Sequence, residues 1–168
     1  MFTLGGESAK GLPKSLQKRS QILVVGIVAN TDLELSQKTS EKYYLTVKSV
    51  STEKVRNEIR VTIDADTFYG FRHGLETLSQ LITFDPDEQS LKIPNKVLIS
   101  DAPIFPFRGI LIDTGRNYFS MSSLKRIVDA MSYNKLNVLH WHMNEQQAFP
   151  FVSERVPELV SHGAYSKR

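Results

Sequence analysis

The chain has 168 residues, of which 40% are hydrophobic and 23% charged, with a formal net charge of +3. This composition is typical of a globular protein, and no apolar run approaches the roughly 18 to 20 residues that span a bilayer. The basic residues are spread along the chain, so we expect no nucleic acid partner. The absence of cysteine excludes disulfides and thiolate metal ligands.

The first twenty residues contain the densest group of basic side chains, Lys14, Lys18 and Arg19. They hold too little continuous apolar character for a secretory signal peptide. Either the chain is cytosolic, therefore, or a leader lies upstream of it. We expect residues 1–20 to be a disordered N-terminal extension.

Three segments that follow have strand character. Residues 21–28 form a β-branched apolar run, whereas residues 43–50 and 58–65 alternate apolar with polar side chains. Such alternation is typical of a sheet that packs on one face.

A helix is predicted after Thr67, where apolar side chains recur at helical spacing: Phe71, Leu75, Leu78 and Ile82. Gly70 and Gly74 lie one turn apart, at positions where a helix backbone can approach a sheet closely. Strands followed by a packing helix predict an α+β domain over residues 21–100.

Residues 101–109, "DAPIFPFRG", mark a domain boundary because they carry two prolines in an aromatic setting. A buried strand at 109–113, an amphipathic helix at 120–136 and a strand at 137–143 then form a β-α-β unit. This unit requires parallel strands and a right-handed crossover. A second domain therefore begins within residues 101–168.

Alternation along these two strands sorts their side chains onto two faces. Asp113 of the first strand shares the more polar face with His140 and His142 of the second. In a parallel α/β barrel the larger apolar set faces the surrounding helices, and the polar set points inward, toward the catalytic end. Polar residues at the end of the first strand are therefore candidates for a site.

Two stretches carry a resemblance to a known family: residues 67–82, "TFYGFRHGLETLSQLI", and residues 105–151, "FPFRGILIDTGRNYFSMSSLKRIVDAMSYNKLNVLHWHMNEQQAFPF". They resemble the helix of the small N-terminal domain and the opening of the catalytic barrel of family 20 glycoside hydrolases. These enzymes are the β-N-acetylhexosaminidases, and the resemblance is greatest to animal and insect members. The two stretches also lie in the order and at the spacing of that family.

The resemblance implies an α+β N-terminal domain followed by the first β-α-β unit of a (β/α)8 TIM barrel, with the barrel incomplete in this chain. It implies removal of terminal N-acetylglucosamine or N-acetylgalactosamine from glycans or chitin oligomers. The retaining mechanism is substrate-assisted, because the 2-acetamido oxygen of the substrate attacks the anomeric carbon. The resemblance implies no cofactor and a secreted or lysosomal location. It also leaves open whether the full-length protein forms a homodimer.

In this family an Asp-Glu pair further along the barrel orients the acetamido group and supplies the general acid and base. The one such pair in this chain, Asp87-Glu88, lies in "FDPDEQS", which is typical of a solvated turn. We therefore expect no catalytic residue in this chain and place the pair beyond Arg168.

Arg116 matches the family's arginine that holds the hydroxyls of the terminal sugar. A guanidinium suits this task because its fixed fork of donors can bind two vicinal hydroxyl oxygens. From the sequence alone, a salt bridge with Asp113 that closes the loop explains Arg116 equally well, and the resemblance favours substrate binding. We expect Asp113 to orient a neighbour, and Arg108 to tie the barrel base or the domain junction.

Glu145 stands where the family usually has Asp, in "WHMNEQ". The family's Asp helps to orient a histidine near the acid-base Glu, so Glu145 and His142 are expected to support the site rather than to touch substrate. Because the side chain is one methylene longer, and a displacement of about 1 Å matters in a preorganised site, we expect this departure to impair activity.

His140 and His142 share a strand face and Glu145 follows them, which also suggests a metal site. No third ligand at a firm spacing from the two histidines is evident, and no metal is expected. Trp141 alternates to the outward face, where core packing beneath the barrel helices is favoured over sugar stacking. The other histidines have no visible partner and are expected at the surface or in packing roles: His73 and His162.

Two function classes remain open. The chain is either part of a glycosidase, as its intact motifs favour, or a non-catalytic truncated isoform or remnant that acts as a binding domain. The lack of continuation after "GAYSKR" favours the second class for this chain as it stands.

Overall fold

The structure is a computed structural model that describes residues 21–50 and 58–165. The chain divides into two compact units, Met1–Ile104 and Phe105–Arg168, each described by itself below. The predicted N-terminal extension, residues 1–20, lies outside the described residues. None of the helices in the described residues is long and apolar enough to cross a membrane.

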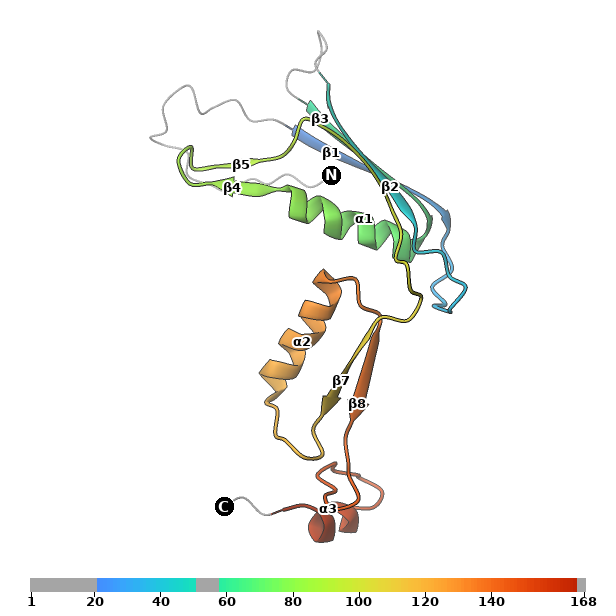
Figure 1. Ribbon diagram of the computed structural model, residues 1–168, viewed down its shortest axis with the longest axis vertical. Coiled ribbons are helices and arrows are strands. Elements are labelled where there is room, and N and C mark those ends of the chain that lie inside the picture. Colours follow the sequence, from blue (N-terminus) through green and yellow to red (C-terminus); the bar gives the residue numbers. More distant parts are fainter. Residues whose placement is uncertain (1–20, 51–57, 166–168) are drawn as a thin grey trace. The chain divides into compact units, whose positions relative to one another are not determined.

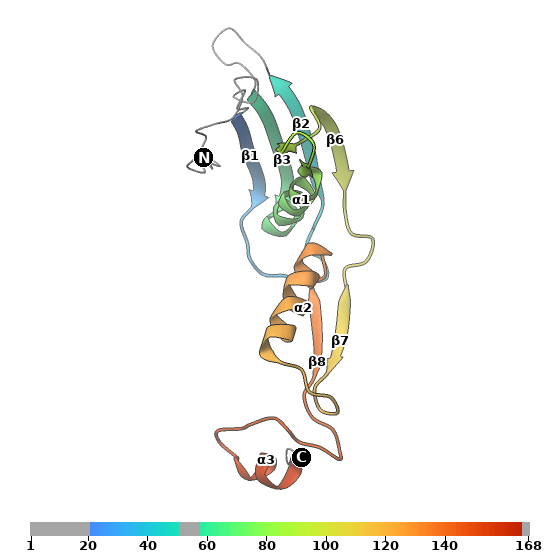
Figure 2. The ribbon, with the colours of Figure 1, turned by 90° about the vertical axis from the view of Figure 1, so that its left-hand side faces the viewer.

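The first unit is built on a four-stranded sheet in the order β1-β3-β2-β6 (Figures 1 and 2). Its strands are β1 (Gln21–Asn30), β2 (Tyr43–Val50), β3 (Glu58–Thr67) and β6 (Lys96–Asp101). β1 runs parallel to β3, whereas β2 runs antiparallel to both β3 and β6. The first three strands confirm the sequence prediction, and β6 was not predicted.

The helix α1 (Phe68–Leu81) lies against one face of this sheet, as Figure 2 shows. Its N-cap is Thr67, whose side chain accepts a hydrogen bond from the backbone N–H of Gly70, a donor that has no partner within the helix. The helix buries Leu78 against alternate side chains of two strands: Tyr43, Leu45 and Val47 of β2, and Val61, Ile63 and Ala65 of β3. This cluster is the core of the unit.

A short hairpin follows the helix, formed by β4 (Thr83–Asp85) and β5 (Ser90–Lys92). Asp85 Oδ1 accepts hydrogen bonds from the backbone N–H groups of Asp87 (2.9 Å) and Glu88 (3.1 Å). The Asp87-Glu88 pair therefore lies in an exposed turn, as predicted.

His73 has a partner that the sequence does not reveal. His73 of α1 is buried, and its Nε2 lies 3.0 Å from Oε1 of Glu41, which is also buried. No partner was visible from the sequence because Glu41 is far away along the chain and no local spacing reveals the pair. The packing role proposed for this histidine fits its burial.

The second unit contains β7 (Gly109–Asp113), α2 (Met121–Tyr133), β8 (Val138–His142) and α3 (Glu158–Gly163). β7 and β8 pair in parallel, as predicted, and form a two-stranded sheet. The Ser120 side chain caps α2 by accepting from the backbone N–H of Ser123. Ile112 of β7 and Met131 of α2 are both buried.

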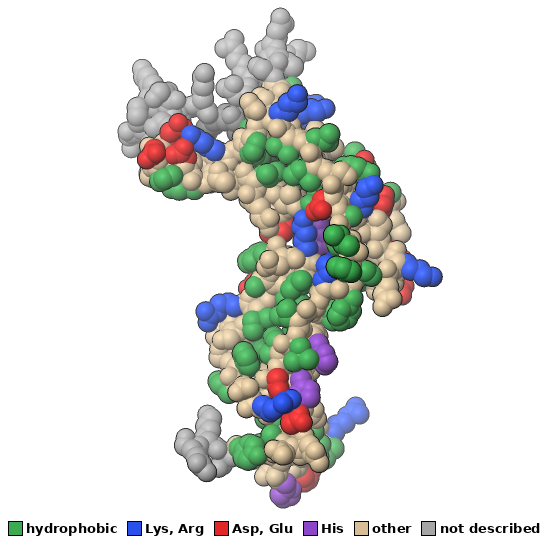
Figure 3. Space-filling view, viewed as in Figure 1, with side chains coloured by type: hydrophobic (Ala, Val, Ile, Leu, Met, Phe, Trp, Pro, Cys, Tyr) green, Lys and Arg blue, Asp and Glu red, His purple; other side chains and the backbone are tan. Residues whose placement is uncertain are grey.

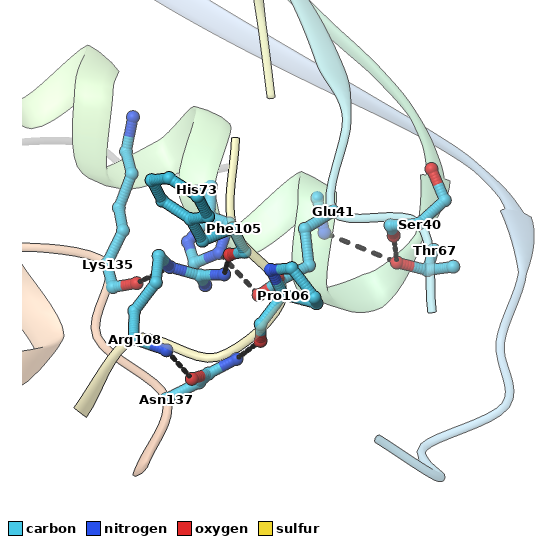
Figure 4. Close-up of polar contacts among 10 residues, drawn as sticks. Ser40, Glu41, Thr67, His73, Phe105, Pro106, Arg108, Lys135 and Asn137 are labelled. Atoms are coloured by element: carbon cyan, nitrogen blue, oxygen red, sulfur yellow. Dashed lines mark hydrogen bonds and ion pairs between the residues drawn. The ribbon is translucent and has the colours of Figure 1, made fainter. Parts of the chain in front are cut away.

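Arg108 ties together the base of this β-α-β unit (Figure 4). Its Nε donates to the carbonyl of Lys135 at 2.7 Å, and its Nη1 donates to the carbonyl of Phe105 at 2.7 Å. Asn137 completes the tie, because its side chain accepts from the Arg108 backbone N–H and donates to the carbonyl of Pro106. These contacts join the start of β7 to the segment that leads into β8.

The predicted apolar stripe of α2 is only partly covered. Val128 is 51% exposed, and Leu111, on the other face of β7, is 60% exposed. Two strands and one helix therefore leave part of the apolar surface of this unit exposed.

The close approach of α1 to the sheet generates a stability prediction. A Cβ at Gly74 would lie 2.5 Å from Ile63 Cγ2 and 3.1 Å from Tyr43 Cδ2, both in the core. We expect Gly74→Ala to lower the free energy of unfolding by about 1–3 kcal/mol through overpacking. Urea denaturation measures this, with the exposed helix position Gln80→Ala as the control. A variant as stable as the wild type would contradict the tight packing.

Candidate functional site

The parallel register of β7 and β8 brings polar side chains together at one sheet edge. Asp113, the last residue of β7, is paired with His142, the last residue of β8. The backbone N–H of Thr114 donates to the carbonyl of His142 at 2.9 Å and continues the pairing past both strands. The loops that leave the two strands therefore start side by side.

The loop after β7 folds back onto Asp113. Oδ1 of this carboxylate accepts from the backbone N–H groups of Gly115 (2.9 Å) and Arg116 (3.1 Å). The resulting turn directs the Arg116 side chain back toward Asp113. Its Nε lies 2.7 Å from Asp113 Oδ2. Gly115 permits this path, since a Cβ there would lie 3.0 Å from the Asn144 backbone.

The loop after β8 supplies a second carboxylate. Glu145 and Ala148 exchange two backbone hydrogen bonds, which closes a tight turn. Glu145 Oε2 then lies 3.0 Å from His142 Nε2 and 3.4 Å from Arg116 Nη2. Figure 3 shows acidic, basic and histidine side chains gathered at this end of the unit.

The cluster lowers the pKa of both acids. For Glu145, the hydrogen bond from His142 is the main cause of the lowered pKa, followed by the backbone N–H of Gln146 and the charge of Arg116. For Asp113, burial by itself would raise the pKa. The backbone N–H of Arg116, the Arg116 charge and the N–H of Gly115 together hold the pKa of Asp113 below its ordinary value.

These pKa directions limit the chemistry of the site. Both carboxylates are ionised at neutral pH, whereas a general acid needs a raised pKa to hold its proton there. Arg116 is 62% exposed. Its Nη1 has no ion-pair partner within the part of the chain that the structure describes. The cluster can therefore present hydrogen-bond donors to a ligand with vicinal oxygens, and neither carboxylate holds a proton that it could donate as a general acid at neutral pH.

The structure brings together the four residues singled out from the sequence: Asp113, Arg116, His142 and Glu145. The Asp113–Arg116 salt bridge that the sequence left open is formed, and it leaves part of the guanidinium accessible. His140 pairs with Leu111 further down the sheet. Among residues 21–50 and 58–165, no three histidine, aspartate or glutamate side chains gather closely enough to hold a metal ion.

Sequence reasoning missed the role of Thr114. Its Oγ1 accepts a hydrogen bond from Trp141 Nε1 at 2.9 Å. Trp141 is 40% exposed, and it lines an open cavity of about 250 Å³ together with apolar side chains that include Phe119 and Met143. A threonine directly after a strand carries no spacing signal that would reveal this contact.

Comparison with known proteins shows which family the chain resembles. Residues 105–168 match the family described as "Glycosyl hydrolase family 20, catalytic domain", and residues 6–81 match "beta-acetyl hexosaminidase like". The chain belongs to glycosyl hydrolase family 20. β1, β2, β3 and α1 thus lie within one matched region, and the β-α-β unit lies within the other.

Individual relatives agree with this family. The chain is 47% identical over 133 residues to a chitooligosaccharidolytic β-N-acetylglucosaminidase of Bombyx mori, covering 79% of this chain and 22% of the relative. It is 43% identical over 154 residues to the protein of the same name from Ostrinia furnacalis, covering 92% and 25%. The chain therefore spans about a quarter or less of the length of these relatives.

Solved structures show the same relation. A Flavobacterium johnsoniae chitobiase matches with a TM-score of 0.66 and 29% identity, over 86% of this chain and 20% of that one. A Vibrio harveyi exo-β-N-acetylglucosaminidase in complex with N-acetylglucosamine matches with a TM-score of 0.62 and 26% identity, over 85% and 20%.

The cluster predicts how Glu145 titrates. Its pKa lies below that of the unfolded chain, so its contribution to stability is present above the unfolded pKa and is lost as the pH falls through the folded value. We expect His142→Asn to raise the Glu145 pKa more than Arg116→Gln does. Carboxyl-detected NMR titration measures both changes. A Glu145 pKa that is unchanged in His142→Asn would contradict the contact between His142 and Glu145.

Proposed function

We propose that this chain is the N-terminal part of a β-N-acetylhexosaminidase, and that β7, α2 and β8 open its TIM barrel. The observation that carries the proposal is the accessible guanidinium of Arg116, fixed at the C-terminal end of a parallel strand within residues that match the catalytic domain. Active sites of such barrels are built from the loops at that end of the strands.

Arg116 is proposed to bind hydroxyls of the terminal sugar. Asp113 holds the Nε edge of its guanidinium, which leaves Nη donors for two vicinal oxygens. His142 and Glu145 support this arrangement without contacting substrate. Because both acids are ionised, the general acid is proposed to lie beyond Arg168. By family resemblance, the Asp that orients the acetamido is placed beside it.

The relatives support the substrate class. Two of them are named for chitooligosaccharides, and the Vibrio harveyi structure contains N-acetylglucosamine. We infer that the substrates are glycans or chitin oligomers with a terminal N-acetylhexosamine, and that hydrolysis is substrate-assisted with retention. By family resemblance, we place the whole protein in the secretory pathway or the lysosome.

A non-catalytic isoform is the second candidate. It is supported by the exposed apolar side chains of Leu111 and Val128, which offer a surface that a binding partner would cover. The transcript beyond Arg168 discriminates the two candidates. An open frame that encodes the Asp-Glu pair supports the enzyme, whereas a stop codon there supports the isoform.

Activity assays test the proposal directly. We expect the 168-residue chain to show no turnover of a chromogenic N-acetylglucosaminide, because general acid catalysis contributes about 10²- to 10⁴-fold and the general acid is proposed to lie beyond Arg168. We expect the full-length protein, extended through the rest of the barrel, to be active. Turnover by the short chain would show that the acid lies within it, and an inactive full-length protein would contradict the enzyme.

Arg116→Lys in the full-length protein tests the binding role. Lysine keeps the charge but loses the planar fork, so we expect kcat/KM to fall about tenfold or more with folding nearly unchanged. The control is Arg126→Lys, an exposed arginine of α2. Loss of folding at unchanged kcat/KM per folded molecule would make Arg116 structural.

A further inference from the structure

One oxygen of Glu145 serves two partners. Oε2 lies 3.0 Å from His142 Nε2 and 3.4 Å from Arg116 Nη2, while Asp113 Oδ2 lies 2.7 Å from Arg116 Nε. Nε–H and the adjacent Nη2 donor form one edge of a guanidinium. This edge of Arg116 is therefore held by two carboxylates from two different loops.

We propose that Glu145 is a positioning residue that fixes the guanidinium plane of Arg116 for sugar binding, and that it needs the full length of a glutamate to do so. The inference rests on the proposed function of Arg116. It differs from the expectation that the glutamate impairs the site, and the two predict opposite effects of shortening its side chain.

A single ion pair does not hold an exposed arginine still. The contact of Asp113 with Nε holds the guanidinium at one atom only, and Arg116 is 62% exposed. A second contact at Nη2 restricts rotation of the guanidinium. Prior ordering of a flexible side chain lowers the entropic cost of binding, which corresponds to about 2- to 12-fold in affinity.

Glu145 is itself held in place on two sides. Its backbone is fixed by the paired hydrogen bonds with Ala148, and its carboxylate is tethered by His142 at the end of β8. Removing one methylene withdraws the carboxylate by up to about 1.5 Å. The Arg116 contact is already 3.4 Å long, so an aspartate at this position cannot reach Arg116 and His142 together.

The first experiment measures the order of Arg116 in the full-length protein and does not depend on activity. We expect the ¹⁵N order parameter of Arg116 Nε to fall in Glu145→Asp, and to fall less in Glu145→Gln, which keeps the length but loses the charge. Glu158→Asp, an exposed glutamate of α3, is the matched control and should leave Arg116 unchanged. An Arg116 that is equally mobile in wild type and Glu145→Asp would overturn the proposal.

The second experiment is a double-mutant cycle in the full-length protein. We expect Glu145→Asp to lower kcat/KM by about 2- to 12-fold, chiefly through KM. The same change in an Arg116→Lys background should have little further effect, because Glu145 acts through that guanidinium. Additive effects, or a higher kcat/KM in Glu145→Asp, would overturn the positioning role.

The two experiments separate the possible failures. If the wild-type full-length protein shows no hexosaminidase activity, the proposed function fails, while the order parameters still decide whether Glu145 fixes Arg116. If the enzyme is active and Arg116→Lys impairs it, but Glu145→Asp leaves both Arg116 order and kcat/KM unchanged, only the positioning role fails.

Discussion

The parallel pairing of β7 with β8 is the constraint on which the candidate site depends. It places Asp113 beside His142, so the loops that carry Arg116 and Glu145 leave the sheet at the same edge. An antiparallel pair would send these loops to opposite ends. The parallel arrangement in turn requires the crossover through α2, and the contacts of Arg108 hold the base of that crossover together.

Asp113, at the end of β7, fixes the position of the Arg116 side chain. One of its oxygens fixes the backbone of the turn, and the other fixes the side chain of Arg116. The same contacts keep the pKa of this carboxylate low, so it is a charged anchor rather than a proton donor. Under the proposed function, substrate binding and acid catalysis therefore fall to different residues, and the described residues serve the first of these tasks.

The sequence allowed prediction of elements with local periodicity, such as α1, α2, β7 and β8. Asp113 and Arg116 were found because they follow a buried strand, and the resemblance supplied a role for Arg116. β6 was missed because its short alternation lies among prolines and its pairing with β2 is distant along the chain. The contacts His73–Glu41 and Arg116–Glu145 were missed for the same reason, since each depends on tertiary folding rather than spacing.

A crystal structure of the full-length protein with N-acetylglucosamine bound tests the central claim most directly. The account predicts sugar hydroxyl oxygens about 2.7–3.2 Å from Nη donors of Arg116. The Nε contact of Arg116 with Asp113 should be preserved in that complex. A sugar bound away from the ends of β7 and β8, or an Arg116 that contacts only the two carboxylates, would contradict it.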